Sequence, residues 1–292
     1  MILDAHTHIY PDKIAAATVR KLSGFTGLTP AFDGTAAGLR QLMRRAGVDM
    51  SIVLPVATNP DKVNRLNDFA MQMNGADGLL SLGSMHPDCP YWKAELDRLA
   101  SNGVRGIKIH PVYQGVDLDD IRYLRIFERA AALHLCVVTH AGYDIGFPGE
   151  KRCMPQQAAN AVQAVGDFKL ILAHMGGWED WDTVEALLPQ TSVYIDTSFA
   201  LSTYQYVNDQ GRDPAIVEAF GAVGDFVQEE QFLRFVRLFG AERILFGSDA
   251  PWDTPETNLR FIRSLPLQQA ETDAILGGNA QRLFGIGTEV ER

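Results

Sequence analysis

The sequence predicts an α/β protein, and it points to a closed (β/α)8 TIM barrel more than to an open doubly wound sheet. Short apolar, β-branched runs alternate with amphipathic helical stretches, and eight such runs can be counted. Each run is apolar throughout, as expected for parallel strands that are covered on both faces. A chain of 292 residues also fits one barrel, so we predict a single domain over residues 1–292.

The predicted elements follow one another regularly along the chain. The strands span residues 2–6, 51–56, 79–85, 104–110, 135–140, 169–174, 192–197 and 243–247. The helical stretches span residues 35–46, 62–73, 91–101, 119–133, 156–165, 181–188 and 228–239. The last of these carries Phe232, Phe235, Val236 and Phe239 at helical spacing, which predicts a stripe facing the core. A closing helix is predicted over residues 271–276, with Gly277 as its stop signal.

The composition is that of an ordinary globular protein, with 46% hydrophobic and 21% charged residues. No apolar run approaches the roughly 18 residues that span a bilayer, and the first strand begins too early to leave room for a signal peptide. The three cysteines show no CxxC spacing, which disfavours a disulfide scaffold and a thiolate zinc site. We therefore expect a cytoplasmic protein without a membrane partner.

The net charge of −10 disfavours nucleic acid as a partner, because such a surface repels phosphate backbones. Neither GxGxxG nor a Walker loop follows a predicted strand, so dinucleotide and P-loop functions lack their motifs. We expect a small-molecule substrate, anionic in character, and a homodimer from general frequency. The irregular residues 199–225 are predicted to form a lid or binding loop, and residues 144–155 a second loop at the mouth.

Polar side chains collect at the carboxyl ends of the predicted strands, which converge on one mouth in a barrel. They are His6, His8, Lys108, His110, His140, His174 and Asp249. Imidazole and carboxylate are the ligands that Zn²⁺ and its first-row neighbours prefer, and His6 and His8 lie on one side of an extended segment. Each histidine taken alone could be a core residue, and Asp249 could be a helix cap. Burying all of them without a cation would leave costly unpaired groups, so the set predicts a metal site.

Five segments in this order resemble the amidohydrolase superfamily, and most closely its amidohydrolase-2 branch, which includes aminocarboxymuconate-semialdehyde-decarboxylase-like proteins. The segments are DAHTH at 4–8, GIKIHP at 106–111, THAG at 139–142, LAHMGG at 172–177 and FGSDAP at 246–251. The tail at 278–284 is similar to the closing segment of that branch. The resemblance covers nearly the whole chain and implies a metal-dependent barrel, in a branch that contains hydrolases, decarboxylases, lactonases and hydratases.

The resemblance implies a role for each matching residue. His6, His8 and His140 match metal ligands, and Asp249 matches a ligand, a proton acceptor, or both. His174 matches a histidine that holds the attacking water or polarises the substrate. The ion itself is expected to be Zn²⁺, with Mn²⁺, Fe²⁺ and Co²⁺ left open.

Lys108 leaves the number of metal ions open. Two-metal members carry a carboxylated lysine on the fourth strand, and His140 and His174 then bind a second ion. One-metal relatives place an unmodified lysine there, which contacts an anionic group of the substrate. We favour one metal and an unmodified ammonium on Lys108.

Four further residues are candidates for substrate binding. His110 lies on the same face of its strand as the preceding lysine. Trp178 could form a pocket wall or pack on a neighbouring helix. Ser198, close to Asp196, could bind substrate or support the ligands. Arg152 could pair with a substrate carboxylate or be a solvated loop residue.

The favoured function is a metal-dependent hydrolase that cleaves a C–N or C–O bond of a small carbonyl or lactone substrate. In it a metal-activated water attacks, Asp249 takes its proton and His174 stabilises the oxyanion. The alternative is a nonoxidative decarboxylase, a lyase, of an unsaturated or aromatic acid, with Asp249 or His174 protonating the carbon. A related nuclease is disfavoured by the acidic charge, and a non-catalytic binding barrel by the complete set of polar residues.

Overall fold

The computed structural model describes residues 1–201 and 226–287, and in these the strands form a closed parallel barrel. The strands are β1 (Leu3–Thr7), β2 (Met50–Val53), β3 (Leu79–Ser81), β4 (Gly83–Ser84), β5 (Gly106–Ile109), β6 (Cys136–Thr139), β7 (Leu170–Leu172), β8 (Tyr194–Asp196) and β9 (Ile244–Leu245). Only Leu82 separates β3 from β4, and its N–H donates to the Val53 carbonyl at 3.0 Å, so β3 and β4 act as one stave. The Ala5 N–H donates to the Phe246 carbonyl at 2.8 Å and joins the last stave to the first. The predicted barrel class is confirmed.

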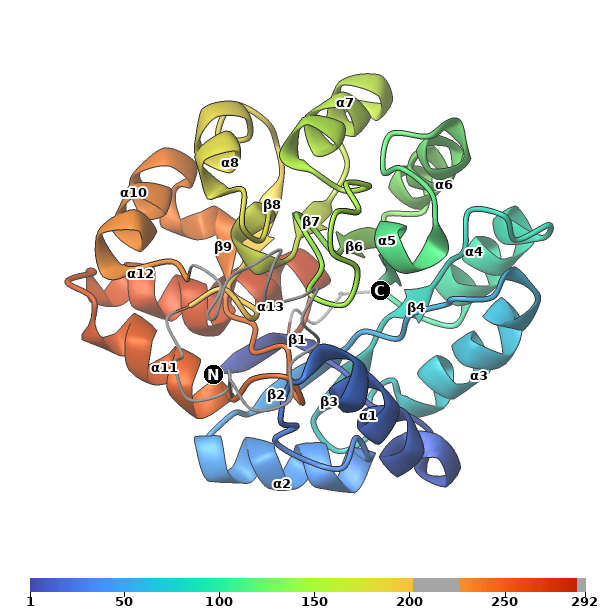
Figure 1. Cartoon of the computed structure of the whole chain (residues 1–292), viewed down its shortest axis with the longest axis horizontal. Coiled ribbons are helices and arrows are strands. Elements are labelled where there is room, and N and C mark those ends of the chain that lie inside the picture. The colour runs from blue at the N-terminus through green and yellow to red at the C-terminus, as the bar shows by residue number, and fades with distance from the viewer. Residues whose placement is uncertain (202–225, 288–292) are drawn as a thin grey trace.

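An outer ring of helices surrounds these strands (Figure 1). The ring contains α2 (Ala36–Ala46), α3 (Val63–Met73), α4 (Trp92–Ser101), α6 (Ile121–Ala132), α7 (Pro155–Val165), α8 (Trp181–Leu187), α10 (Glu229–Phe239), α11 (Pro255–Ser264) and α12 (Gln269–Asp273). The predicted core stripe of α10 is confirmed, because Phe232, Phe235, Val236 and Phe239 are all buried. No helix in the described ranges is long and apolar enough to cross a membrane.

The other helical segments are one long helix, α1, and several short ones. They are α1 (Asp12–Thr26), α5 (Pro111–Gln114), α13 (Asn279–Phe284), the single turns η1 (Pro60–Lys62), η2 (His174–Gly176) and η3 (Ala241–Arg243), and the π-helical η4 (Ala274–Gly278). The predicted stop at Gly277 is confirmed as a kink, because this residue has the non-helical angles φ 176° and ψ −30° inside η4, before the chain continues into α13. A side chain at Gly277 would meet the Met1 carbonyl at 2.3 Å, so glycine here serves close packing against the N-terminus.

The barrel interior is apolar below the mouth. Inward-facing residues of the strands pack with Leu283 and Phe284 of α13, which closes the end opposite the mouth. On β6, Val138 faces this interior cluster, and His140 comes two residues later on the same face of the extended chain. The strands therefore place apolar residues deep in the barrel and polar residues where they end. Of the predicted lid at 199–225, residues 202–225 lie outside the described residues.

Candidate metal centre and its cavity

Three side chains from the first and last staves converge at the mouth. The Nε2 atoms of His6 and His8 lie 3.4 Å and 3.1 Å from the same oxygen, Oδ1 of Asp249. All their candidate ligand atoms lie within 4.8 Å of one another. A side chain at Gly247 would come within 2.9 Å of the His6 Cβ, so a glycine is required where the last stave passes the first.

Hydrogen bonds on the far side of each imidazole determine which nitrogen faces the carboxylate. His8 Nδ1 donates to the Leu54 carbonyl at 2.8 Å, and His6 Nδ1 donates to Asp196 Oδ2 at 2.9 Å. In the neutral rings both Nε2 atoms are then unprotonated, so two lone pairs point toward the Asp249 oxygen. Groups that only accept hydrogen bonds are brought together in a buried place, which suits a divalent first-row cation. These residues fit the implied metal.

Asp196 is the buried support of this arrangement. Its Oδ1 accepts hydrogen bonds from the N–H groups of His174 and Ser198, at 3.2 Å and 3.0 Å, and from the Ser198 hydroxyl. Burial alone would raise the Asp196 pKa, but the neighbouring His6 imidazole and the hydrogen bonds lower it to about 2. Asp196 is therefore an anion that orients His6.

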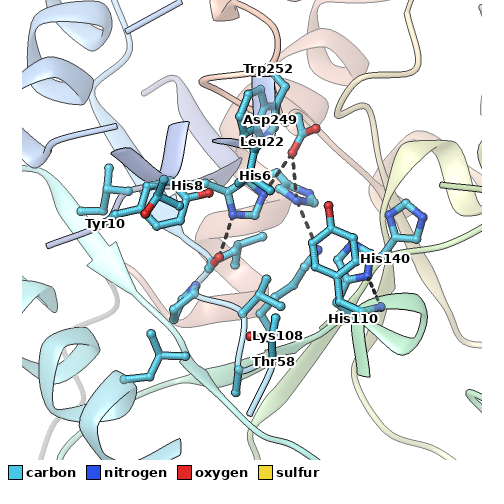
Figure 2. A pocket seen from close by; sticks show the side chains of 18 of the residues that line it. His6, His8, Tyr10, Leu22, Thr58, Lys108, His110, His140, Asp249 and Trp252 are labelled. Carbon is cyan, nitrogen blue, oxygen red and sulfur yellow. Dashed lines mark hydrogen bonds and ion pairs between the residues drawn. The ribbon is translucent and has the colours of Figure 1, made fainter. Parts of the chain in front are cut away.

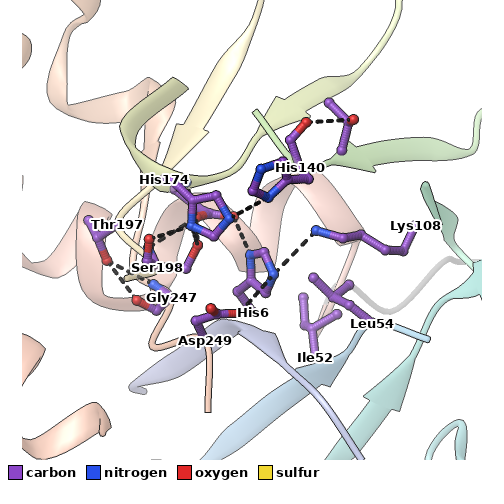
Figure 3. A network of polar contacts seen from close by, with 12 residues as sticks. His6, Ile52, Leu54, Lys108, His140, His174, Thr197, Ser198, Gly247 and Asp249 are labelled. Carbon is purple, nitrogen blue, oxygen red and sulfur yellow. Dashed lines mark hydrogen bonds and ion pairs between the residues drawn. The ribbon is translucent and has the colours of Figure 1, made fainter. Parts of the chain in front are cut away.

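Lys108 points into the site from β5, with Nζ at 3.3 Å from His6 Nε2 (Figure 3). The side chain is fully buried, and this burial lowers the Lys108 pKa to about 8. The pKa of His6 falls to about 4, first because of burial and second because of the Lys108 charge. A cationic Lys108 is thus available to bind an anionic group beside the three converging residues.

His140 and His174 form a second pair of facing imidazoles. His140 Nδ1 and His174 Nε2 lie 3.0 Å apart (Figure 3). The opposite nitrogens donate to the Tyr143 carbonyl at 2.9 Å and to the Ser198 carbonyl at 2.7 Å. When both rings are neutral, the facing nitrogens are two lone pairs, so a proton or a cation must lie between them.

The structure does not bring His140 into the group of His6, His8 and Asp249. Its Nε2 instead lies 3.8 Å from Asp144 Oδ2, which is also 3.4 Å from His110 Nε2, and these three residues form a second cluster of possible ligands. Asp144 was not among the predicted site residues, although its place four residues after His140 was a usable signal. Burial raises the Asp144 pKa to about 7.

The backbone adopts left-handed conformations at the two predicted catalytic residues. The φ angles are 59° at His174 and 65° at Asp249. Such angles are uncommon outside glycine, although Asp and His adopt them more readily than most residues. Contacts with the Ser198 carbonyl and with His8 Nε2, respectively, hold these two side chains in fixed directions.

A cavity of about 1540 Å³ opens above these residues. It contains His6, His8, Lys108, His110, His140, His174, Trp178 and Asp249 in its lining, and Figure 2 shows most of them facing a common space. Aromatic walls that the sequence analysis missed come from Tyr10, Tyr113, Tyr143, Phe147, Phe199 and Trp252.

Two predicted substrate-binding residues do not line this cavity. Arg152 pairs with Glu150 at 2.8 Å and Asp117 at 3.2 Å, so its charge is already compensated by loop carboxylates. Ser198 is buried behind the cavity wall and donates its hydroxyl to Asp196. Among the alternatives weighed from sequence, its contacts are those of a ligand support.

The sequence matches a known protein family. The amidohydrolase family matches residues 3–286. The chain belongs to this family. A search of curated proteins found no match.

Solved structures share the fold of this amidohydrolase at low sequence identity. A 5-carboxyvanillate decarboxylase from Sphingomonas paucimobilis is 15% identical, with a TM-score of 0.67 over 97% of this chain and 98% of the other. A dihydroxybenzoic acid decarboxylase from a Polaromonas species, with bound manganese and an inhibitor, is 15% identical, with a TM-score of 0.65 over 97% and 96%. A candidate 2-pyrone-4,6-dicarboxylic acid hydrolase from Pseudomonas putida is 18% identical, with a TM-score of 0.64 over 99% and 98%.

Proposed function

We propose that this amidohydrolase is a metal-dependent nonoxidative decarboxylase of an unsaturated or aromatic carboxylic acid. The charge of the buried site is the observation that carries the proposal. A divalent cation and Lys108 would bring three positive charges against the two negative charges of Asp196 and Asp249. The nearby Asp144 adds less than a full negative charge at neutral pH, because burial raises its pKa to about 7. A monoanionic carboxylate balances this difference, whereas a neutral lactone or amide leaves it uncompensated in a buried place.

The cavity walls and the related structures support the same choice. The aromatic residues around the metal centre offer faces on which a flat, unsaturated acid can stack. The similar structures described above are named for carboxylic acids, and two of them are decarboxylases. These comparisons favour decarboxylation over the hydrolysis that we favoured from sequence.

The residues would divide the work as follows. His6, His8 and Asp249, with His140 as a further predicted ligand, would hold the cation, which would supply Lewis-acid polarisation of substrate oxygens. Lys108 would hold the carboxylate. His174 or Asp249, first protonated from water, would deliver that proton to the carbon from which the carboxyl group leaves. The bond between this carbon and the carboxyl group breaks, carbon dioxide leaves, and no external oxidant is needed.

Hydrolysis is the second candidate, because the dicarboxylic acid hydrolase has the same fold and its named substrate is also an anion. The two reactions differ in what leaves the substrate and in where oxygen from water goes.

The test is a panel of aromatic and unsaturated acids incubated with metal-loaded protein in oxygen-labelled water. We expect carbon dioxide to be released and the remaining product to carry no label. Labelled product without carbon dioxide would overturn decarboxylation in favour of hydrolysis. Asp249→Asn should slow the reaction by about 10²- to 10⁴-fold. Glu95→Gln, which changes a buried carboxylate on the outer helix α4, is the matched control and should retain it.

A further inference from the structure

The cavity extends beyond the metal centre to a rim between α1 and α3. Its outer lining includes Lys13, Ile14, Thr18, Lys21 and Leu22 of α1. The spacing of these positions places them on one face of the helix. In Figure 2, Leu22 lies in the same cavity as the site histidines. Helix α1 therefore forms a wall of the substrate cavity.

Cations concentrate on this rim in a chain that is otherwise acidic. The sequence contains seven lysines, at positions 13, 21, 62, 93, 108, 151 and 169. Four of these seven, Lys13, Lys21, Lys62 and Lys108, line the one cavity, and Arg65 joins them. Within the described part of the chain, none of the four rim cations at 13, 21, 62 and 65 forms an ion pair.

Apolar side chains line the same cavity as the rim cations and the metal centre. They are Ile14, Leu22, Leu28, Leu66 and Phe69. Ile14 is 51% exposed and faces this cavity. Lys13 and Lys21 are eight residues apart, or roughly 12 Å along the helix axis, so the rim is broad.

The size of the cavity also exceeds what a benzoate-sized acid needs. Pockets for drug-sized ligands are commonly about 300–1,000 Å³, and this one is about 1540 Å³. A small acid at the metal centre would leave the α1 and α3 walls unused.

We propose that the substrate is an elongated acid with two anionic ends. The reacting carboxylate lies at Lys108 and the metal centre, the apolar body follows α1 and α3, and a second carboxylate or a phosphate binds the rim cations Lys13, Lys21, Lys62 and Arg65. The inference rests on the proposed function for the identity of the first end only, because binding at the rim requires no turnover.

Isothermal titration of the metal-loaded protein with saturated acids tests this inference, since these probes cannot react. The probes are decanedioate, decanoate and succinate, which has two charges but little length. We expect decanedioate to bind at least about tenfold tighter than either of the others, with an advantage that falls as salt is added. The same chain with a terminal phosphonate shows which anion the rim prefers, phosphate if it binds tighter and carboxylate if it does not.

Two variants with equal charge changes complete the experiment. In the first, Lys13, Lys21, Lys62 and Arg65 are all replaced by Gln, and the advantage of decanedioate should disappear. In the control, four exposed cations outside the cavity, Arg20, Arg44, Lys93 and Arg237, are replaced by Gln, and the advantage should remain.

Equal affinities of the wild type for decanedioate and decanoate would overturn the inference, as would an unchanged advantage in the rim variant. A protein that shows the rim-dependent difference but decarboxylates no acid would refute the proposed function and leave the two-ended ligand standing.

Discussion

Asp196→Asn should weaken metal binding without unfolding the barrel. Asp196 Oδ2 accepts the His6 Nδ1–H at 2.9 Å, while its other oxygen accepts two backbone N–H groups and the Ser198 hydroxyl. Asparagine has nearly the same volume, and its carbonyl can keep the backbone contacts. Its NH₂ group would then face His6 Nδ1 and favour the tautomer that carries the proton on Nε2, the nitrogen needed for the metal.

The size of the effect follows from the role of the lost contact. Removing a carboxylate that orients a ligating imidazole typically costs 10- to 100-fold in metal affinity. This corresponds to about 1.4–2.7 kcal/mol of binding free energy. The pKa of Asp196 is already as low as about 2, so the contact is with an anion across the neutral pH range.

The assay is competition between the protein and a chromogenic chelator for Zn²⁺ and, separately, Mn²⁺. Glu95→Gln serves as the matched variant, because Glu95 is a buried carboxylate that accepts from Asn67 at 2.7 Å on the outer helices. It should lose stability and keep its metal affinity. If Asp196→Asn binds both ions within about twofold of the wild type while remaining folded, the tautomer argument fails.

Three further outcomes are expected. Asp249→Asn should lower kcat on the acid found in the screen by about 10²- to 10⁴-fold, measured by carbon dioxide release; a near-normal rate would exclude its proton-transfer role. Arg122 hydrogen-bonds Asp120 and lowers its pKa to about 2. The stability advantage of the wild type over Asp120→Asn should therefore persist above about pH 4 and shrink as pH falls toward 2, in urea unfolding; a constant difference would contradict this. Phe232→Ala should cost about 3–5 kcal/mol in the same assay, because its side chain is fully buried; a loss below 1 kcal/mol would show that the core closes over the gap.

The barrel could be predicted because its strands are short apolar runs whose carboxyl ends all lie at the mouth. The same argument found the convergence of His6, His8 and Asp249, since extended segments direct alternate residues to one side. It missed α1, in which Ala15, Val19 and Thr26 are the buried residues among the side chains that the structure describes. A helix that covers the mouth has little core-facing pattern to detect.

Loop residues could not be placed in the same way. Arg152 and Asp144 both lie in the segment after β6. Arg152 pairs with loop carboxylates, whereas Asp144 pairs with two imidazoles. The direction of a loop side chain depends on tertiary contacts, here the Gly146 N–H that donates to Asp144 at 2.8 Å. The α1 and α3 cations were likewise individually unremarkable, because only the fold shows that they border one cavity.

The facing nitrogens at the mouth explain why function and stability are separated along the barrel axis. The neutral imidazoles of His140 and His174 place one acceptor against another, and the Nε2 atoms of His6 and His8 face the Asp249 carboxylate. Both arrangements cost free energy unless a proton or a cation lies between the groups. Left-handed backbone at His174 and Asp249 adds strain at the same level of the barrel. The offsetting stabilisation comes from below, where the apolar interior and α13 exclude water. The hydrogen-bond acceptors of a cation site can therefore face one another without partners, because the lower half of the barrel holds the backbone of the site in place.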